Sequence, residues 1–326
     1  KKEMYMKFTF KIQKYQTEAV DSLVKCFEGQ QFADKVQYLR DKGLMPKLVK
    51  QEVQTELFEK EKTEEEQLEE ADNGYRNAEL VLSEKELLDN IHKIQDKNFI
   101  IHSAKIEKTA NRPSFDIEME TGTGKTYVYT KTMYELNKAY GWSKFMIVVP
   151  SVAIREGIFK SLEYTQEHFM EHYGKKIRFF IYNSKRLNMI DQYSSSADIN
   201  VMIINTQAFN TSLNKEKNIE GRKGNEAARI IYTKRDEFAS RRPIDVIAAN
   251  HPILILDEPQ KMGGDATQKA LEQFKPLFTI NYSATHKVQH NLVYRLDALD
   301  AYNQKLVEKI KVKGFKLEIF KLFVAR

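Results

Sequence analysis

Short apolar runs alternate with longer amphipathic segments along most of this sequence, and this alternation constrains the fold more than any other feature. Several runs are continuously apolar, which is typical of strands covered on both faces. Strand and helix repeated in this way predict an α/β fold with a mainly parallel sheet and helices on both faces. The expected strands are 99–106, 115–119, 145–149, 177–182, 199–205, 253–256 and 278–282. The expected helices are 126–140, 152–173, 227–238, 266–274 and 292–307.

The N-terminal third departs from this alternation. A run at 8–12 predicts a short strand, and an amphipathic pattern at 15–27 predicts a helix after it. From about 30 to 97 the composition is charged and helix-favouring, so we expect an inserted helical segment there. Within it, 59–70 is nearly a run of Glu and Lys. A solvated helix face explains this run best, and a docking surface for a partner is the alternative.

Composition and charge narrow the class of protein. With 41% hydrophobic and 30% charged residues, the chain has enough apolar material for a large core and enough charge for a soluble protein. Its net charge of +6 is a mild bias toward polyanions such as nucleic acid. Cys26 is the only cysteine, which excludes an intrachain disulfide. No apolar run approaches the roughly 20 residues that span a bilayer, and no signal peptide opens the sequence, so we expect a cytoplasmic protein without membrane contact.

The stretch from 115 to 126 has the order expected of a phosphate-binding loop. A short β-branched and aromatic run leads into Glu-Thr-Gly-Thr-Gly-Lys-Thr, which opens a helical pattern. Backbone N–H groups of such a loop and of the first helical turn point at phosphates. Lys125 adds a positive charge near the β- and γ-phosphates, and the Thr126 hydroxyl can bind Mg²⁺. The usual pattern has glycine where this chain has Met119, so the match taken alone is partial.

Two further segments place polar side chains directly after apolar strands. The run 253–256 ends in Asp257 and Glu258, at the carboxyl end of a strand, where open α/β sheets bind ligands. Asp257 is suited to hold Mg²⁺ and Glu258 to deprotonate an attacking water, although solvated acids at a strand exit are also common. Ser283 and Thr285 follow another apolar strand and can relay the state of a γ-phosphate. Taken alone, they also fit a turn or a helix cap.

These segments occur in an order that resembles a known family. Glu-Thr-Gly-Thr-Gly-Lys-Thr, Val-Val-Pro-Ser-Val-Ala-Ile-Arg-Glu-Gly, Asp-Glu-Pro-Gln and Tyr-Ser-Ala-Thr-His look like the motifs of superfamily 2 helicase-type motors. More narrowly, they resemble the restriction (Res) subunit of type III restriction–modification enzymes, because Gln260 stands where commoner relatives have Asp or His. The stretch 294–307 is similar to the family's sequence after the third motif. The family also carries methionine at the position of Met119, which removes the objection to the phosphate loop.

The resemblance implies a nucleotide-binding role for most motif residues. The Gln16 amide, which can both donate to and accept from an adenine edge, would read the base. The loop that would hold the phosphates of ATP consists of Thr121, Gly122, Thr123, Gly124, Lys125 and Thr126, with Thr126 also on Mg²⁺. The catalytic group would be Lys125, Asp257 as metal ligand, Glu258 as base, and Gln260. Coupling of nucleotide state to DNA movement would fall to Gln260, Ser283 and Thr285.

The same resemblance implies contact with double-stranded DNA. The residues that match the family's DNA-contacting regions are Pro150, Ser151, Arg155, Thr206 and Gln207. Such contacts to the DNA backbone position a protein without reading bases. The specific DNA sequence would therefore be recognised by a partner, the modification (methyltransferase) subunit. For Arg155, a solvated charge at a helix start is the competing explanation.

The resemblance also implies a division into domains. Residues 1–307 correspond to a first RecA-like P-loop NTPase domain, and 308–326 to the start of a connection to a second motor domain. That second domain, which brings arginine fingers to the γ-phosphate, and the family's nuclease domain have no counterpart in this sequence. We therefore expect a piece of a larger subunit, in which ATP-dependent translocation or switching licenses DNA cleavage. By itself this piece would hydrolyse ATP poorly and cut no DNA.

Two alternatives to this function remain open from the sequence. The first keeps the motor but places it in another helicase–nuclease of defence or repair. The second is a nucleotide-regulated DNA-binding module that never turns over. Glu258 argues against the second alternative, because a pure switch does not need a carboxylate beside the metal-binding Asp257.

Overall fold

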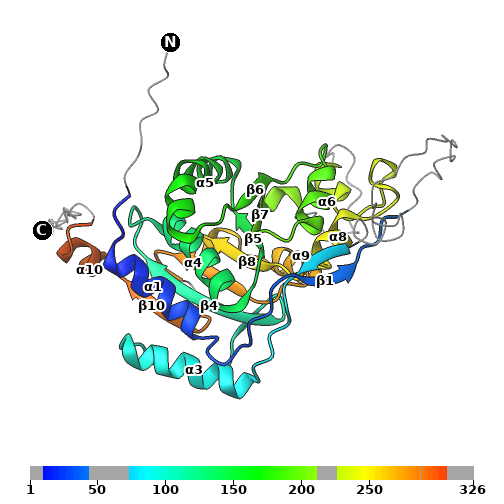
Figure 1. Cartoon of the computed structure of the whole chain (residues 1–326). Helices are drawn as coiled ribbons and strands as arrows, with labels where there is room; N and C mark the ends of the chain where they lie inside the picture. Colours follow the sequence, from blue (N-terminus) through cyan, green and yellow to red (C-terminus); the bar gives the residue numbers. More distant parts are fainter. Residues whose placement is uncertain (1–9, 44–72, 211–225, 287, 307–326) are drawn as a thin grey trace, which may run out of the picture.

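A large β-sheet organises the part of the chain that the structure, a computed structural model, describes: residues 10–43, 73–210, 226–286 and 288–306. Parallel strands follow one another in the order β10-β4-β9-β8-β5-β7-β6, and β3 pairs with β4 in the antiparallel sense (Figure 1). The predicted α/β fold with a mainly parallel sheet is therefore confirmed. The strands are β3 (Lys108–Thr109), β4 (Arg112–Met119), β5 (Lys144–Val149), β6 (Arg178–Ile181), β7 (Asn200–Asn205), β8 (Ile253–Asp257), β9 (Thr279–Ser283) and β10 (Leu292–Leu296).

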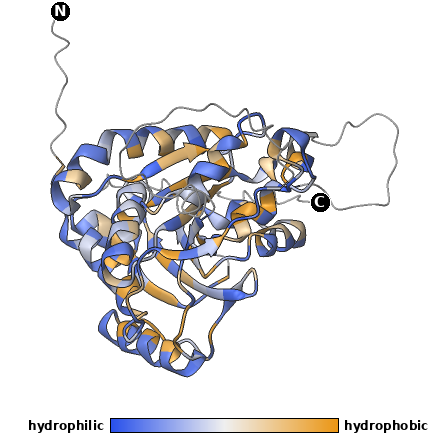
Figure 2. Cartoon of the chain, turned by 45° about the vertical axis from the view of Figure 1, so that its right-hand side comes forward, coloured by the Kyte–Doolittle hydropathy of each residue, from blue (hydrophilic) through white to orange (hydrophobic). Residues whose placement is uncertain are grey.

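Helices cover both faces of this sheet. Because successive side chains of a strand point to opposite faces, Phe145 and Ile147 of β5 lie in one core, and Met146 and Val148 lie in the other. Figure 2 shows hydrophobic strands in the interior and hydrophilic residues along the outer sides of the helices. The helices of the first core are α1 (Lys14–Lys25), α3 (Glu84–Lys97), α4 (Lys125–Tyr140) and α5 (Val152–Tyr173). Those of the second core are α6 (Asn188–Ser195), α8 (Pro243–Ala248) and α9 (Asp265–Gln273).

The parallel topology decides where a ligand can bind. The carboxyl ends of the parallel strands open on the same edge of the sheet, so the segments that follow them gather there. In open α/β sheets this edge is the usual binding site. Two residues at this edge suit the starts of the helices that follow the strands. Gly124 directly precedes α4, and the Ser151 hydroxyl caps α5 by accepting a hydrogen bond from Ile154 N at 3.3 Å. None of the described helices is long and apolar enough to cross a bilayer.

The described part of the segment 30–97, which was expected to be helical, forms a helix only at its end. Before α3 it contains two short strands, β1 (Val36–Leu39) and β2 (Asn73–Arg76), which pair with each other in the antiparallel sense. Asn77 fastens the returning strand to the sheet: its Nδ2 donates to Lys144 O at 2.8 Å and to His251 O at 2.9 Å. The acidic run 59–70 lies outside the described residues. The expectation of an inserted helical segment is therefore wrong at β1 and β2 and correct at α3.

Two predicted strands are not formed. Residues 10–13 are irregular and lead directly into α1, where the Phe10 ring packs at 5.3 Å from the ring of His168; residues 8 and 9 lie outside the described range. The run 99–106 is also irregular. Phe99 has a φ of 54°, which is incompatible with a strand, and Ser103 N donates to the Gln95 side chain of α3 at 2.9 Å. Backbone groups that a strand would pair with a neighbour are bound here to the preceding helix.

Two predicted helices were also wrong in part. The C-terminal stretch 292–307 begins with an edge strand, β10, which pairs with β4, and only then forms α10 (Ala298–Asn303). The stretch 227–238 is broken into α7 (Glu226–Ile230) and a short 3-10 turn, η2 (Asp236–Phe238). In the first case pairing with a distant strand overrides the local helical pattern. The other short 3-10 turns are η1 (Thr206–Ala208) and η3 (Pro259–Lys261).

Lys144, the first residue of β5, gives the fold an expected pH dependence. Its side chain is buried, and its Nζ donates to the carbonyl oxygens of Tyr193 and Ser196, the latter at 2.5 Å. Burial lowers the pKa of Lys144 to about 7. An unfolded lysine has a pKa of about 10.4, so folding releases a proton between these values and stability rises with pH across this window. A neutral amine still has two protons for the two carbonyls.

We expect Lys144→Met to remove this rise. Between pH 7.5 and 9.5 the free energy of unfolding of the wild type should climb by up to about 1.4 kcal/mol per pH unit relative to the variant. Urea denaturation at a series of pH values measures it, with the exposed Lys176→Met as matched control. Equal slopes in the wild type and Lys144→Met would mean that Lys144 stays charged when folded.

Candidate functional site

The loop between β4 and α4 has a backbone geometry suited to a bound phosphate. Gly122 and Gly124 have φ values of 85° and 87°, a left-handed conformation that glycine adopts without strain. Gly124 immediately precedes α4, so the free N–H groups of the first helical turn open onto the loop. Met119 is the buried last residue of β4. It lies in the strand, where the usual glycine is not required.

The threonines of the loop divide into two kinds. Thr123 is buried, and its hydroxyl donates to Glu120 O at 2.6 Å, so it fastens the loop from within. Thr121 is exposed, and its N–H donates to the Glu120 carboxylate at 2.8 Å. The Thr126 hydroxyl accepts a hydrogen bond from Tyr129 at 3.2 Å. Thr121 and Thr126 line a cavity of about 680 Å³, together with Gln16, Gly122, Gly124, Lys125, Asp257, Glu258 and Lys261.

The start of α1 lies against this loop. The Tyr15 hydroxyl donates to Thr123 O at 2.7 Å, and Gln16 Nε2 lies 3.3 Å from the same carbonyl oxygen. The structure thus brings Gln16 to the nucleotide cavity, where its contact with adenine stays a prediction. Sequence reasoning missed the role of Tyr15, and its place beside Gln16 was the one available clue.

Alanine substitutions of the two glycines test the contact between Gln16 and the loop. Both positions have positive φ, which costs a residue with a Cβ about 1–2 kcal/mol. At Gly124 a Cβ would also lie 2.8 Å from Gln16 Nε2, whereas at Gly122 it would meet nothing within 4 Å. We expect Gly124→Ala to weaken Mg·ATP binding by about tenfold more than Gly122→Ala, the equivalent of one lost hydrogen bond of about 1.4 kcal/mol. Titration calorimetry measures it, and equal losses would argue against a role of Gln16.

Strand β8 ends in two carboxylates with different surroundings. Asp257 is 7% exposed, and burial raises its pKa to about 6; repulsion from Glu258 adds to this, while Lys125 opposes it. Burial also raises the pKa of Glu258, but the hydrogen bond and the charge of Lys125 outweigh it and leave this pKa below its ordinary value. Glu258 has a φ of 59°, a conformation that costs a non-glycine residue of order 1–3 kcal/mol. Strain at this residue is consistent with a functional constraint.

Asp257 and Thr126 fit the Mg²⁺ that the phosphate loop implies. Asp257 Oδ1 is buried and has no hydrogen-bond partner among the described residues. Carboxylate oxygens are the ligands that Mg²⁺ prefers, and this ion usually takes only one or two protein groups besides phosphates and water. The described part of the chain contains no cluster of three or more His, Cys, Asp or Glu able to hold a metal ion.

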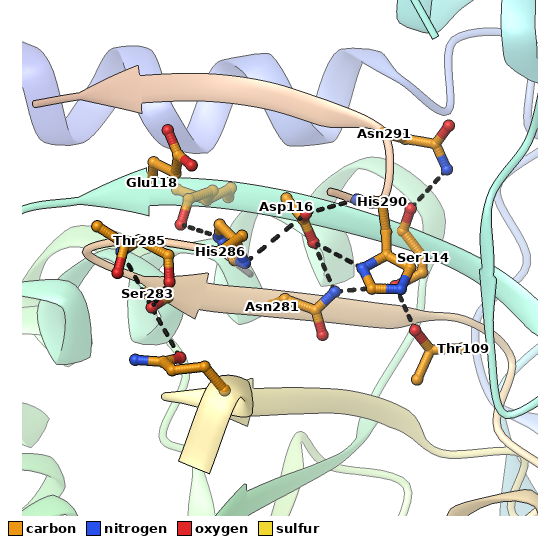
Figure 3. A network of polar contacts seen from close by, with 12 residues as sticks. Thr109, Ser114, Asp116, Glu118, Asn281, Ser283, Thr285, His286, His290 and Asn291 are labelled. Atoms are coloured by element: carbon orange, nitrogen blue, oxygen red, sulfur yellow. Dashed lines mark hydrogen bonds and ion pairs between the residues drawn. The ribbon is translucent and has the colours of Figure 1, made fainter. Parts of the chain in front are cut away.

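A chain of polar contacts leads from Lys125 away from the cavity. Lys125 Nζ lies 3.0 Å from Glu258 Oε1, and Gln260 Nε2 donates to Glu258 Oε2. The Ser283 hydroxyl lies 2.8 Å from Gln260 Oε1 and 2.7 Å from Thr285 O. We call Glu258, Gln260, Ser283 and Thr285 the coupling chain; Figure 3 shows its Ser283 end. Since Ser283 has one hydroxyl proton, it can donate to Gln260 or to Thr285, but not to both at once.

The predicted DNA-contact residues lie at the neighbouring ends of β5 and β7. Arg155 Nη1 donates to Asn205 Oδ1 at 2.9 Å, and Gln207 Nε2 donates to Pro150 O at 3.4 Å. Arg155 and Gln207 line a groove of about 710 Å³. The other predicted residues adjoin it, Ser151 as the cap of α5 and Thr206 in η1. Arg155 is therefore no freely solvated charge, and its contact with DNA stays a prediction. Asn205, which orients Arg155, was missed because nothing in the sequence singles it out.

Comparison with known proteins places this site in a family. A family model described as "Type III restriction enzyme, res subunit" matches residues 9–288. The chain is 34% identical over 248 residues to the EcoPI Res subunit of Escherichia phage P1 and 33% identical over 248 residues to the EcoP15I Res subunit of Escherichia coli. Each match covers 72% of this chain and 25% of the relative. The chain therefore spans about a quarter of the length of these curated relatives.

Two solved structures show more distant likeness. A nuclease-deletion mutant of the Type ISP restriction-modification enzyme LlaGI, in complex with a DNA substrate mimic, has a TM-score of 0.39 and 12% identity over 69% of this chain and 20% of its own. The UvsW helicase from Bacteriophage T4 has a TM-score of 0.31 and 11% identity over 64% of this chain and 62% of its own. The family match, in contrast, covers most of the chain and confirms the resemblance drawn from the motifs. The chain belongs to the family of type III restriction enzyme Res subunits.

Proposed function

We propose that this chain binds and hydrolyses ATP as the first RecA-like domain of a DNA motor in a type III restriction enzyme. The observation that carries the proposal is the contact of 3.0 Å between Lys125 Nζ and Glu258 Oε1. The cation of a phosphate loop and the acid after β8 thus line one cavity with Asp257, whose Oδ1 has no hydrogen-bond partner among the described residues. A cation, a metal-binding acid and a base are among the groups that phosphoryl transfer to water uses.

In the proposed reaction, Lys125 and Glu258 exchange partners when nucleotide binds. Without nucleotide the two side chains neutralise each other, which keeps two partly buried charges paired. The phosphates of ATP compete for Lys125, and this competition releases the Glu258 carboxylate. Gln260, already hydrogen-bonded to Glu258, then holds it in position.

Glu258 is the general base of the proposed hydrolysis. While Lys125 pairs with it, before nucleotide binds, Glu258 has a lowered pKa and is ionised at neutral pH. Once the phosphates take Lys125, the freed carboxylate can accept a proton from the attacking water. The water oxygen forms a bond to the γ-phosphorus, the bond from that phosphorus to the bridging oxygen breaks, and ADP leaves with the electron pair. Mg²⁺, which Asp257 and Thr126 would hold, supplies positive charge to the phosphates.

The groove beside Arg155 is the proposed contact with double-stranded DNA. It lies at the same edge of the sheet as the nucleotide cavity, and its polar groups suit backbone contacts that do not read sequence. In the whole subunit a second motor domain and a nuclease domain would complete the enzyme, and translocation or switching would license cleavage. A modification (methyltransferase) subunit is the proposed partner that recognises the site.

Nucleotide binding and turnover test this proposal separately. The chain itself should bind ATP at millimolar concentration in the presence of Mg²⁺, which titration calorimetry detects, and binding should weaken when the ion is chelated. The full-length subunit with its modification partner should hydrolyse ATP faster when cognate DNA is added. Absence of Mg²⁺-dependent ATP binding would contradict the proposed phosphate site. Binding without DNA-stimulated hydrolysis would favour a nucleotide-regulated module over a motor.

A further inference from the structure

The face of β4 and β9 that lies opposite α1 and α4 is polar, whereas the neighbouring strand β8 places Leu254 and Leu256 on this face. On this face of β4 lie Ser114, Asp116 and Glu118, while Phe115 and Ile117 point into the first core. The facing residues of β9 are polar too, and the strand register sets Asp116 opposite Asn281. Figure 3 shows Ser114 and Asp116 joined through Asn281, whose Nδ2 donates to both. A buried polar network is costly unless its groups are satisfied, so a role beyond packing is worth seeking.

Asp116 is the centre of this network. Its side chain is fully buried; Oδ1 accepts a hydrogen bond from Asn281 Nδ2 at 2.7 Å, and Oδ2 accepts one from His290 N at 2.6 Å. The imidazoles of His286 and His290 each place Nδ1 at 3.7 Å from the carboxylate. A buried carboxylate needs such partners, because an uncompensated charge there is strongly destabilising.

Three of these contacts come from the segment that joins β9 to β10. The His290 backbone and both imidazoles belong to it, so Asp116 holds the segment at two points. His286 is also fixed from its other side, where Nε2 lies 3.4 Å from Ile117 O. Asp116 on β4 therefore contacts this segment at His286 and at His290, while Asn291 at its end binds Glu107 and Ser114.

The same segment carries the end of the coupling chain. Thr285, directly before His286, places its carbonyl oxygen 2.7 Å from the Ser283 hydroxyl, which also lies 2.8 Å from Gln260. If the segment shifts, we expect the Ser283 hydroxyl to change between donating to Gln260 and donating to Thr285. That change alters the position of the Gln260 amide, and so the hydrogen bond by which Gln260 holds the Glu258 carboxylate.

We propose that Asp116 is a positioning residue for ATP hydrolysis, acting through His286 and His290 on the segment that carries Thr285 and so on the coupling chain. It touches neither the nucleotide cavity nor the proposed metal ligands. The inference rests on the function proposed above, because it assumes that Glu258 is the base. It predicts that loss of the Asp116 charge slows the chemical step and leaves nucleotide affinity nearly unchanged.

The titration of His290 offers a readout that does not depend on turnover. The charged groups that face His290 are Asp116 and Glu107, with His286 on the far side of Asp116. The Asp116 carboxylate raises the pKa of His290 above its ordinary value against the opposing effect of burial. A histidine whose pKa is raised by folding contributes stability that is present below about pH 6.5 and is lost as the pH rises through the folded pKa.

Asp116→Asn is the test, because Asn keeps the shape of the side chain and removes its charge. In the full-length subunit we expect kcat for DNA-stimulated hydrolysis to fall about tenfold, as for a modest misplacement of a reacting group, with ATP affinity within about twofold of wild type. The decrease in the free energy of unfolding that His290 causes as the pH rises should also be smaller in Asp116→Asn than in the wild type. Asp96→Asn is the matched control, because Asp96 forms a comparable pair with His102 at 2.7 Å on the surface of α3.

Each outcome bears on the inference. If Asp116→Asn matches the wild type in kcat while Lys125→Ala abolishes turnover, Asp116 positions nothing and the proposed function stands. If Lys125→Ala is itself harmless, the proposed function fails first. Should Asp116→Asn not fold, His290→Gln serves instead, since it leaves the backbone N–H to Asp116 intact and removes one imidazole. A kcat unchanged in that variant, with the wild-type pH dependence of stability, would overturn the proposal.

Discussion

Glu258→Gln in the full-length subunit is expected to lower kcat for ATP hydrolysis by about 10²–10⁴-fold, the range for removal of a general base. The amide is nearly isosteric, so the strained backbone at φ 59° and the contact with Gln260 can persist. Gln accepts no proton from water, and only the chemical step should suffer. ATP affinity should stay constant or rise slightly, because a negative charge near the phosphates is removed.

Single-turnover hydrolysis and equilibrium nucleotide binding separate these two effects. Glu272→Gln, an exposed acid on α9, is the matched control and should keep wild-type kinetics. A variant at Glu258 that turns over at the wild-type rate would assign the base to another residue. A loss of affinity as large as the loss of kcat would point to damage of the cavity instead.

Lys125→Ala should produce the second largest effect, and on binding as well as on rate. A hydrogen bond to a charged group contributes about 1.5–3 kcal/mol, so the loss of Lys125 should weaken ATP binding by roughly 10- to 100-fold. The variant also leaves Glu258, now without its partner at 3.0 Å, beside the phosphates, which adds repulsion. Turnover should therefore be undetectable at ATP concentrations that saturate the wild type.

The measurement is nucleotide titration on the chain itself, followed by DNA-stimulated hydrolysis in the full-length subunit. Lys160→Ala, an exposed lysine of α5, removes the same charge from the surface and should change neither quantity. The double variant Lys125→Ala with Glu258→Gln should recover part of the affinity, because the repulsive carboxylate is gone. No recovery would show that the ion pair does not govern access of the phosphates to Lys125.

Sequence reasoning succeeded where a strand is buried on both faces. The runs 145–149 and 253–256 are apolar without interruption, and 199–205 is apolar except at Asn200 and Asn205; each forms an internal strand within one or two residues of the prediction. The candidate site followed from the same strands, because Asp257 and Glu258 stand directly after one of them. A local pattern was sufficient there, and the topology brought the polar ends together.

Sequence reasoning failed where the decisive partner is distant in the chain. Leu292–Leu296 fits a helix locally and becomes β10 because β4 offers it an open edge. The run 99–106 is apolar enough for a strand, yet Phe99 and Ile101 are almost fully exposed and its polar groups bind α3. Asp116 is one of two acidic residues in the run 115–119, and only the fold shows that His286 and His290 face it.

The antiparallel pairing of β1 and β2 brings the two ends of the insertion together. Leu39 stands opposite Asn73, so the polypeptide leaves this two-stranded sheet and re-enters it at neighbouring points. Asn77 fixes this return at the amino-terminal edge of β5, whereas the nucleotide cavity lies at the carboxyl-terminal edge. Because β1 and β2 pair with each other in a sheet of their own, a change in the number of residues between them need not move a strand of the large sheet. Loop-closure entropy grows only slowly with such length, which makes this junction a natural point for gaining or losing whole segments.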